Sequence, residues 1–115
     1  MVASIAIREK WTAQEKRVID TFVQAVRDTV GERAKRIILY GSRARGDADV
    51  DSDFDFLVLI EPFYTADKHI IREIGNQVSF DTNCYVSVRT IREAEFTEDR
   101  FFYFYENVNK EGIDL

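Results

Sequence analysis

Two aspartates in an apolar run are the side chains of this sequence that are best suited to chemistry. Asp53 and Asp55 alternate with Phe54 and Phe56, and the apolar run continues to Ile60. Side chains alternate along a β-strand, so both carboxylates would lie on one face, with Cα atoms about 7 Å apart. Two carboxylates at this separation repel each other, and a divalent cation removes that conflict. Mg²⁺ typically binds through one or two carboxylates, waters and substrate phosphates, so the pair predicts a magnesium and phosphate site.

A glycine and a serine upstream of these aspartates have the properties of a phosphate-binding turn. Gly41 and Ser42 end a short β-type run at residues 36–40. Glycine allows the backbone to approach a ligand closely, and the N–H groups of such a turn attract phosphate, as does a serine hydroxyl. Arg43 and Arg45 would add charge-assisted hydrogen bonds to phosphate oxygens. The alternative for both arginines is pairing with the neighbouring aspartates.

A third carboxylate would complete a catalytic site for two metal ions and would activate an attacking hydroxyl. Asp81 is the candidate for this role, because we expect it at the start of a strand over residues 80–90. The alternation of apolar residues around Asp81 is irregular. The alternative is an aspartate with a structural role at a strand start or a turn.

The elements that position these residues follow from hydrophobic spacing and from helix start and stop signals. Thr12 and Glu15 form a capping-box pattern that predicts the start of a helix, and Gly31 predicts its end. We expect helices over residues 12–30, 64–76 and 98–109 and strands over residues 36–40, 54–60 and 80–90. This order predicts an α/β (α+β) fold with a small mixed β-sheet flanked by helices. At 115 residues the chain is expected to form a single domain, residues 1–115.

Composition and charge argue against several classes of protein. The net charge is −5 and the only basic cluster lies beside an acidic run, so we do not expect binding to duplex nucleic acid. No run approaches the roughly 20 apolar residues of a membrane span. The single cysteine, Cys84, cannot form an internal disulfide, which fits a reducing compartment. We therefore expect a cytoplasmic protein.

The spacing of the glycine, the serine and the two aspartates resembles a known family signature. The motif of the DNA polymerase β-like nucleotidyltransferase superfamily is similar to one in this sequence. Here it consists of Gly41-Ser42, ten intervening residues and then Asp53-x-Asp55. The Ser-Arg-Ala-Arg-Gly run at 42–46 resembles the minimal nucleotidyltransferase (MNT) branch, as does the tail at 102–113. The resemblance implies the polymerase β-like fold and the use of Mg²⁺ with ATP or another nucleoside triphosphate. It also implies that Gly41 and Ser42 bind the triphosphate, while Asp53 and Asp55 hold metal.

The same resemblance implies an activity and a partner. It predicts an enzyme that transfers a nucleoside monophosphate, AMP from ATP, to a hydroxyl of a protein, and that acts as the antitoxin of a HEPN-domain toxin. One alternative is an antitoxin with little or no turnover that neutralises its partner by occlusion. A further alternative is a small-molecule nucleotidyltransferase, which would need a second active-site wall, for example from a homodimer through the aromatic C-terminal helix.

Overall fold

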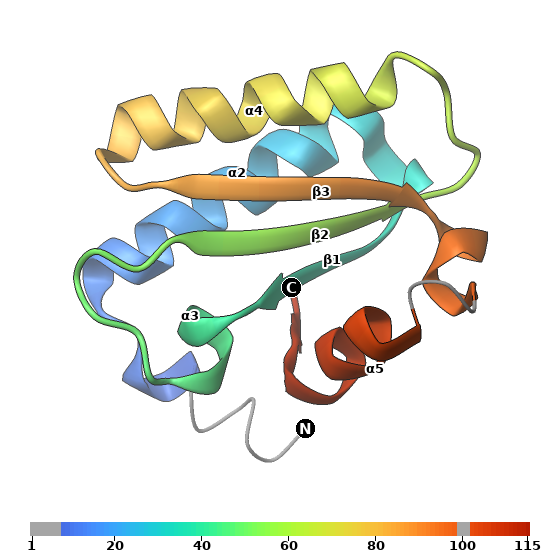
Figure 1. Ribbon diagram of the computed structural model, residues 1–115. Coiled ribbons are helices and arrows are strands. Elements are labelled where there is room, and N and C mark those ends of the chain that lie inside the picture. Colours follow the sequence, from blue (N-terminus) through green and yellow to red (C-terminus); the bar gives the residue numbers. More distant parts are fainter. Residues whose placement is uncertain (1–7, 99–101) are drawn as a thin grey trace.

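A four-stranded mixed sheet forms the centre of the molecule in the computed structural model, which describes residues 8–98 and 102–115 (Figure 1). The strands lie in the order β3-β2-β1-β4. β1 pairs antiparallel with both β2 and β4, whereas β2 pairs parallel with β3. Their bounds are β1 (Ala34–Tyr40), β2 (Phe54–Ile60), β3 (Val86–Arg92) and β4 (Ile113–Asp114). The expected fold class, a small mixed sheet flanked by helices, is confirmed.

Two helices, α2 (Ala13–Val30) and α4 (Asp67–Thr82), cover one face of this sheet (Figure 1). The predicted capping box is present, since the Thr12 hydroxyl accepts from the Glu15 N–H and the Glu15 carboxylate accepts from the Thr12 N–H. Residues spaced three or four apart on α2 are buried, and Phe22 among them stacks on Phe56 of β2 with ring centroids 4.1 Å apart. The apolar stripe of α2 therefore fixes the helix against the strand that follows the two aspartates.

The third major helix, α5 (Phe102–Glu111), packs on the opposite face of the sheet. Tyr105 and Val108 of α5 belong to the same buried cluster as Leu57 and Leu59 of β2. The even-numbered residues of β2, from Phe54 onward, pack in the other cluster with α2 and α4. Because faces alternate along a strand, Asp55 lies on the α5 side of the sheet, at the N-terminal end of β2.

Three predicted elements are displaced along the chain. The helix expected over residues 64–76 begins at Asp67 and continues to Thr82, because its buried stripe extends through Gly75, Val78 and Thr82. Asn83 ends it with a left-handed φ of 54°. The strand expected over residues 80–90 therefore begins at residue 86. The last helix runs over 102–111 rather than 98–109, and residues 99–101 of that prediction lie outside the described residues.

Among the described residues, no helix combines the length and the apolar character needed to cross a membrane.

A buried ion pair holds the start of α4. The Asp67 side chain is 2% exposed and accepts from the Arg33 guanidinium at 2.7 and 3.1 Å and from the Tyr64 N–H at 2.7 Å. The hydrogen bonds from Arg33 lower the pKa of Asp67, and burial opposes them. A depressed carboxylate pKa means that the stabilisation is present above the unfolded-state pKa of about 3.9 and is lost as pH falls through the folded-state value.

We therefore expect Asp67→Ala to lower the free energy of unfolding at pH 7 by about 2–3 kcal/mol, somewhat below the loss typical of fully buried pairs because Arg33 keeps partial exposure. Chemical denaturation measures this loss, with Asp20→Ala on the exposed side of α2 as the control. The difference from the wild type should shrink below about pH 4. A loss of equal size at pH 3 and pH 7 would contradict the role assigned to the ion pair.

Candidate nucleotidyl-transfer site

Asp55 lies in the middle of a row of side chains that crosses the sheet. It is paired with Tyr40 of β1 in the antiparallel register and with Ser87 of β3 in the parallel register. Directly paired residues point to the same face of a sheet, so all three side chains face the α5 side. Asp53 immediately precedes β2 and is exposed, whereas Asp55 is half-buried.

The two aspartates interact electrostatically. Burial raises the pKa of Asp55, the negative charge of Asp53 raises it further, and Arg45 opposes both. A folded-state pKa above the usual value means that the ionised form of Asp55 is disfavoured until a cation is present. Two adjacent carboxylate donors fit one Mg²⁺ that completes its shell with waters and nucleotide phosphates. Within residues 8–98 and 102–115, no cluster of three or more His, Cys, Asp or Glu side chains could hold a metal.

Gly41 brings the turn that is predicted to bind phosphate against the Asp55 carboxylate. It stands between β1 and α3 (Ser42–Arg45) with φ at 75°, in the region that favours glycine. A Cβ atom at this position would lie 2.4 Å from Oδ2 of Asp55, closer than two non-bonded heavy atoms can approach. The first N–H groups of a helix have no partner within that helix, so Ser42 and the residue after it begin α3 with donors available to a ligand. Glycine is thus required at position 41 for two reasons. The backbone φ is positive, and the Asp55 carboxylate leaves no space for a Cβ atom.

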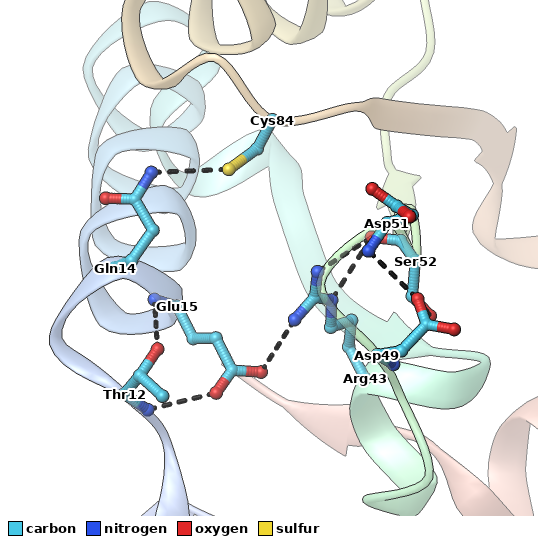
Figure 2. A network of polar contacts seen from close by, with 8 residues as sticks. All are labelled: Thr12, Gln14, Glu15, Arg43, Asp49, Asp51, Ser52 and Cys84. Atoms are coloured by element: carbon cyan, nitrogen blue, oxygen red, sulfur yellow. Dashed lines mark hydrogen bonds and ion pairs between the residues drawn. The ribbon is translucent and has the colours of Figure 1, made fainter.

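Arg43 connects α2 to the loop that carries Asp49, Asp51 and Ser52, as Figure 2 shows. Its guanidinium donates two hydrogen bonds to the Ser52 carbonyl, at 2.8 and 3.2 Å, and pairs with Glu15 at 3.2 Å. The same group lies over the Phe54 ring, 4.3 Å from its centroid, and the side chain is only 10% exposed. Neither of the two expectations for Arg43 describes these contacts, because its partners are a carbonyl and a distant glutamate rather than a neighbouring aspartate. Arg43 holds the loop in place.

The loop between α3 and β2 has its own internal hydrogen bonds (Figure 2). The Asp49 carboxylate accepts from the Asp51 N–H at 2.9 Å, and the Ser52 hydroxyl accepts from the Asp49 N–H at 3.0 Å. Asp49 is therefore engaged in shaping the turn that leads into Asp53.

Arg45 is the arginine that remains accessible beside the turn. Its side chain is 44% exposed and pairs with Asp47 at 3.3 Å and Glu111 at 3.4 Å. A cavity of about 350 Å³ lies here between the end of β1 and α5, and its walls include Gly41, Arg45 and Glu111. A second cavity of about 340 Å³ lies on the α2 side of Arg43 and is lined by neither Gly41 nor Arg45. Of these two cavities, the first is the one that adjoins Gly41.

Asp81 does not join the other two carboxylates. The prediction that it begins the third strand is wrong, because α4 continues to Thr82. The Asp81 side chain accepts from Gln77 one helical turn earlier at 2.9 Å, and its carbonyl accepts from Arg17 of α2 at 3.3 Å. Since α2 and α4 cover the face opposite α5, Asp81 lies on the other side of the sheet from Asp55.

Ser87 occupies the position beside Asp55 that the sequence interpretation overlooked. Its neighbours Val86 and Val88 face Gly75 of α4, so the serine points to the α5 face. In the sequence, the alternation Val86-Ser87-Val88 indicates that Ser87 faces away from the two valines, once the strand is known to start at residue 86.

We expect Arg43→Met to lower the free energy of unfolding by about 1–3 kcal/mol, because it removes charge-assisted hydrogen bonds from a nearly buried guanidinium. It should also make residues 46–53 more susceptible to limited proteolysis. The control is Arg72→Met on the exposed side of α4. Equal stability and equal proteolysis of the two variants would show that Arg43 does not anchor the loop.

The motif-bearing part of the chain matches a known family model and several known proteins. The model of the nucleotidyltransferase domain matches residues 19–115. Two proteins of Methanocaldococcus jannaschii, each named "putative protein adenylyltransferase", are similar over most of both chains. One is 32% identical over 99 residues (85% of this chain and 95% of the relative), and the other is 29% identical over 98 residues (85% and 94%). A solved structure titled "Structure of putative minimal nucleotidyltransferase" aligns at 26% identity with a TM-score of 0.49, over 81% of this chain and 92% of that one.

The matched span begins within α2 and includes the glycine–serine turn and both aspartates of the site. The chain therefore belongs to the nucleotidyltransferase domain family.

Proposed function

We propose that this protein transfers AMP from ATP to a hydroxyl of a protein acceptor, with Mg²⁺ bound by Asp53 and Asp55. The observation that supports the proposal is the close approach of the Gly41 turn to the Asp55 carboxylate, which would bring phosphate donors and metal ligands side by side. The names of the two archaeal relatives, which specify protein adenylyltransferase, support both AMP and a protein acceptor.

Each group of the site has a role in this reaction. The ion would neutralise phosphate charge and orient the α-phosphate. The backbone at Gly41 and the Ser42 hydroxyl would hold the phosphates, and Arg45 would reach them after leaving Asp47 and Glu111. The acceptor oxygen bonds to the α-phosphorus, the bond from that phosphorus to the β-phosphate oxygen breaks, and pyrophosphate leaves. The hydroxyl proton passes to solvent.

The acceptor would arrive on a partner, for which we propose a HEPN-domain toxin, with this chain as the antitoxin. Phe102 and Tyr103 of α5 are 54% and 81% exposed. The next residue of the same helix, Phe104, lines the cavity beside Gly41. A protein bound on these two aromatic side chains would therefore stand next to the nucleotide.

A second candidate function is neutralisation of the partner by binding alone. The observation in its favour is that the described residues contain no group of three or more His, Cys, Asp or Glu side chains that could hold a metal ion, because a site with fewer metal ligands supports slower turnover.

Co-expression with the candidate toxin distinguishes the two functions. Under the first, the toxin gains the mass of an AMP group, and Asp53→Asn/Asp55→Asn abolishes both the modification and the protection of cells. Under the second, the same double variant still protects cells and the toxin mass is unchanged. A toxin that stays unmodified in the presence of active wild-type protein would refute protein adenylylation of this partner.

A further inference from the structure

The position next to Asp55 on the adjacent strand decides how many metal ions the site can take. The side chains that flank Asp55 across the sheet are Tyr40 on β1 and Ser87 on β3. Neither a phenol nor a serine hydroxyl is ionised at neutral pH, so the row that contains Asp55 supplies one carboxylate. Asp53, just before β2, supplies the second.

Two divalent ions need more negative charge than this pair provides. In two-metal sites the ions are about 3.5–4 Å apart, and carboxylates that bridge or flank them offset their repulsion. A third carboxylate would have to project from the same face of the sheet and adjoin Asp55. The residue that meets both conditions on β3 is Ser87, because Val86 and Val88 face α4.

The next residue along the same face of β3 carries a positive charge. Arg89 follows Ser87 by two positions, and its guanidinium lies over the Phe104 ring of α5, 4.8 Å from the centroid. It is near enough to Tyr40, the other neighbour of Asp55, to influence the pKa of that phenol electrostatically. A positive charge at this position supplies none of the negative charge that a second cation needs.

We propose that the site holds one divalent cation per bound nucleotide and that Ser87 is the residue that sets this limit. The inference rests on the proposed function, since it concerns the metal site of that reaction. The inference also predicts that Ser87→Asp creates a second ion site, because the substitution places a third carboxylate beside Asp55.

The test counts ions rather than turnover. Mn²⁺ is titrated into the protein saturated with a non-hydrolysable ATP analogue, and electron paramagnetic resonance measures bound against free metal. We expect about one Mn²⁺ per chain for the wild type and about two for Ser87→Asp. Ser87→Asn, which has nearly the shape of aspartate without its charge, is the matched control and should bind about one. Thermal melts establish that each variant is folded, and the wild-type count decides the single-ion part of the inference even where a variant is not.

The outcomes separate this inference from the proposed function. Two ions bound to the wild type would overturn the single-ion inference and leave the proposed function standing. One ion bound to folded Ser87→Asp would overturn the assignment of the limit to Ser87. If neither the nucleotide analogue nor Mn²⁺ binds to the wild type, the proposed function fails and the inference fails with it.

Discussion

Replacing Asp53 and Asp55 together with asparagine is expected to reduce nucleotidyl transfer by at least about 10³-fold, because the variant loses both anionic ligands for the ion that neutralises the phosphates. The fold should survive. Since the raised pKa of Asp55 reports that its charged form is disfavoured in the folded protein, removing the charge should not lower the melting temperature in metal-free buffer. Transfer of labelled AMP and a thermal melt measure the two effects.

The matched control for this variant is Asp51→Asn. Asp51 is exposed in the same loop, and its backbone N–H rather than its carboxylate makes the hydrogen bond to Asp49. It should retain activity within a few-fold of the wild type. Equal activity of the double variant and of Asp51→Asn would show that the aspartate pair is not the metal site.

Gly41→Ala is the substitution with the second-largest expected effect. The added Cβ would lie 2.4 Å from Oδ2 of Asp55, and the backbone φ of 75° is unfavourable for alanine. The carboxylate or the turn must therefore move, and each movement damages the proposed site. We expect Mg²⁺-dependent ATP affinity to fall by at least about 100-fold, and stability to fall by about 1–3 kcal/mol. Calorimetric titration and chemical denaturation measure these changes.

Gly31→Ala separates backbone strain from the clash with the carboxylate. Gly31 has a similar φ of 60° at the end of α2, but a Cβ there would meet no atom within 4 Å. This control should lose about 1–2 kcal/mol of stability and keep the full nucleotide affinity. If Gly41→Ala loses no more affinity than Gly31→Ala, the close approach of Gly41 to Asp55 has no part in binding.

Local signals in the sequence predicted the parts of the molecule that depend on short-range geometry. The capping box at Thr12 and the apolar spacing behind it predicted α2, and the alternation around Asp53 and Asp55 predicted β2. The structure also brings the Gly41 turn against Asp55, as the interpretation of the two motifs requires. The roles assigned to these residues in binding nucleotide and metal stay predictions.

Features set by tertiary contacts could not be predicted in the same way. The end of α4 is set by burial of its apolar stripe against the sheet, so the strand predicted over residues 80–90 was placed too early in the chain. The position of Ser87 beside Asp55 follows from the parallel pairing of β2 with β3, which joins residues about thirty positions apart. Arg43 meets Glu15 across a similar separation. Sequence spacing alone carries no information on such pairings.

The most direct test of the central claim is calorimetric titration of ATP into the purified protein, with and without Mg²⁺, for the wild type and for Asp55→Asn. The predicted result is binding by the wild type that requires Mg²⁺ and is lost in the variant. Binding of equal strength in metal-free buffer, or binding that Asp55→Asn leaves unchanged, would contradict the assignment of the aspartate pair and the Gly41 turn as a magnesium–nucleotide site.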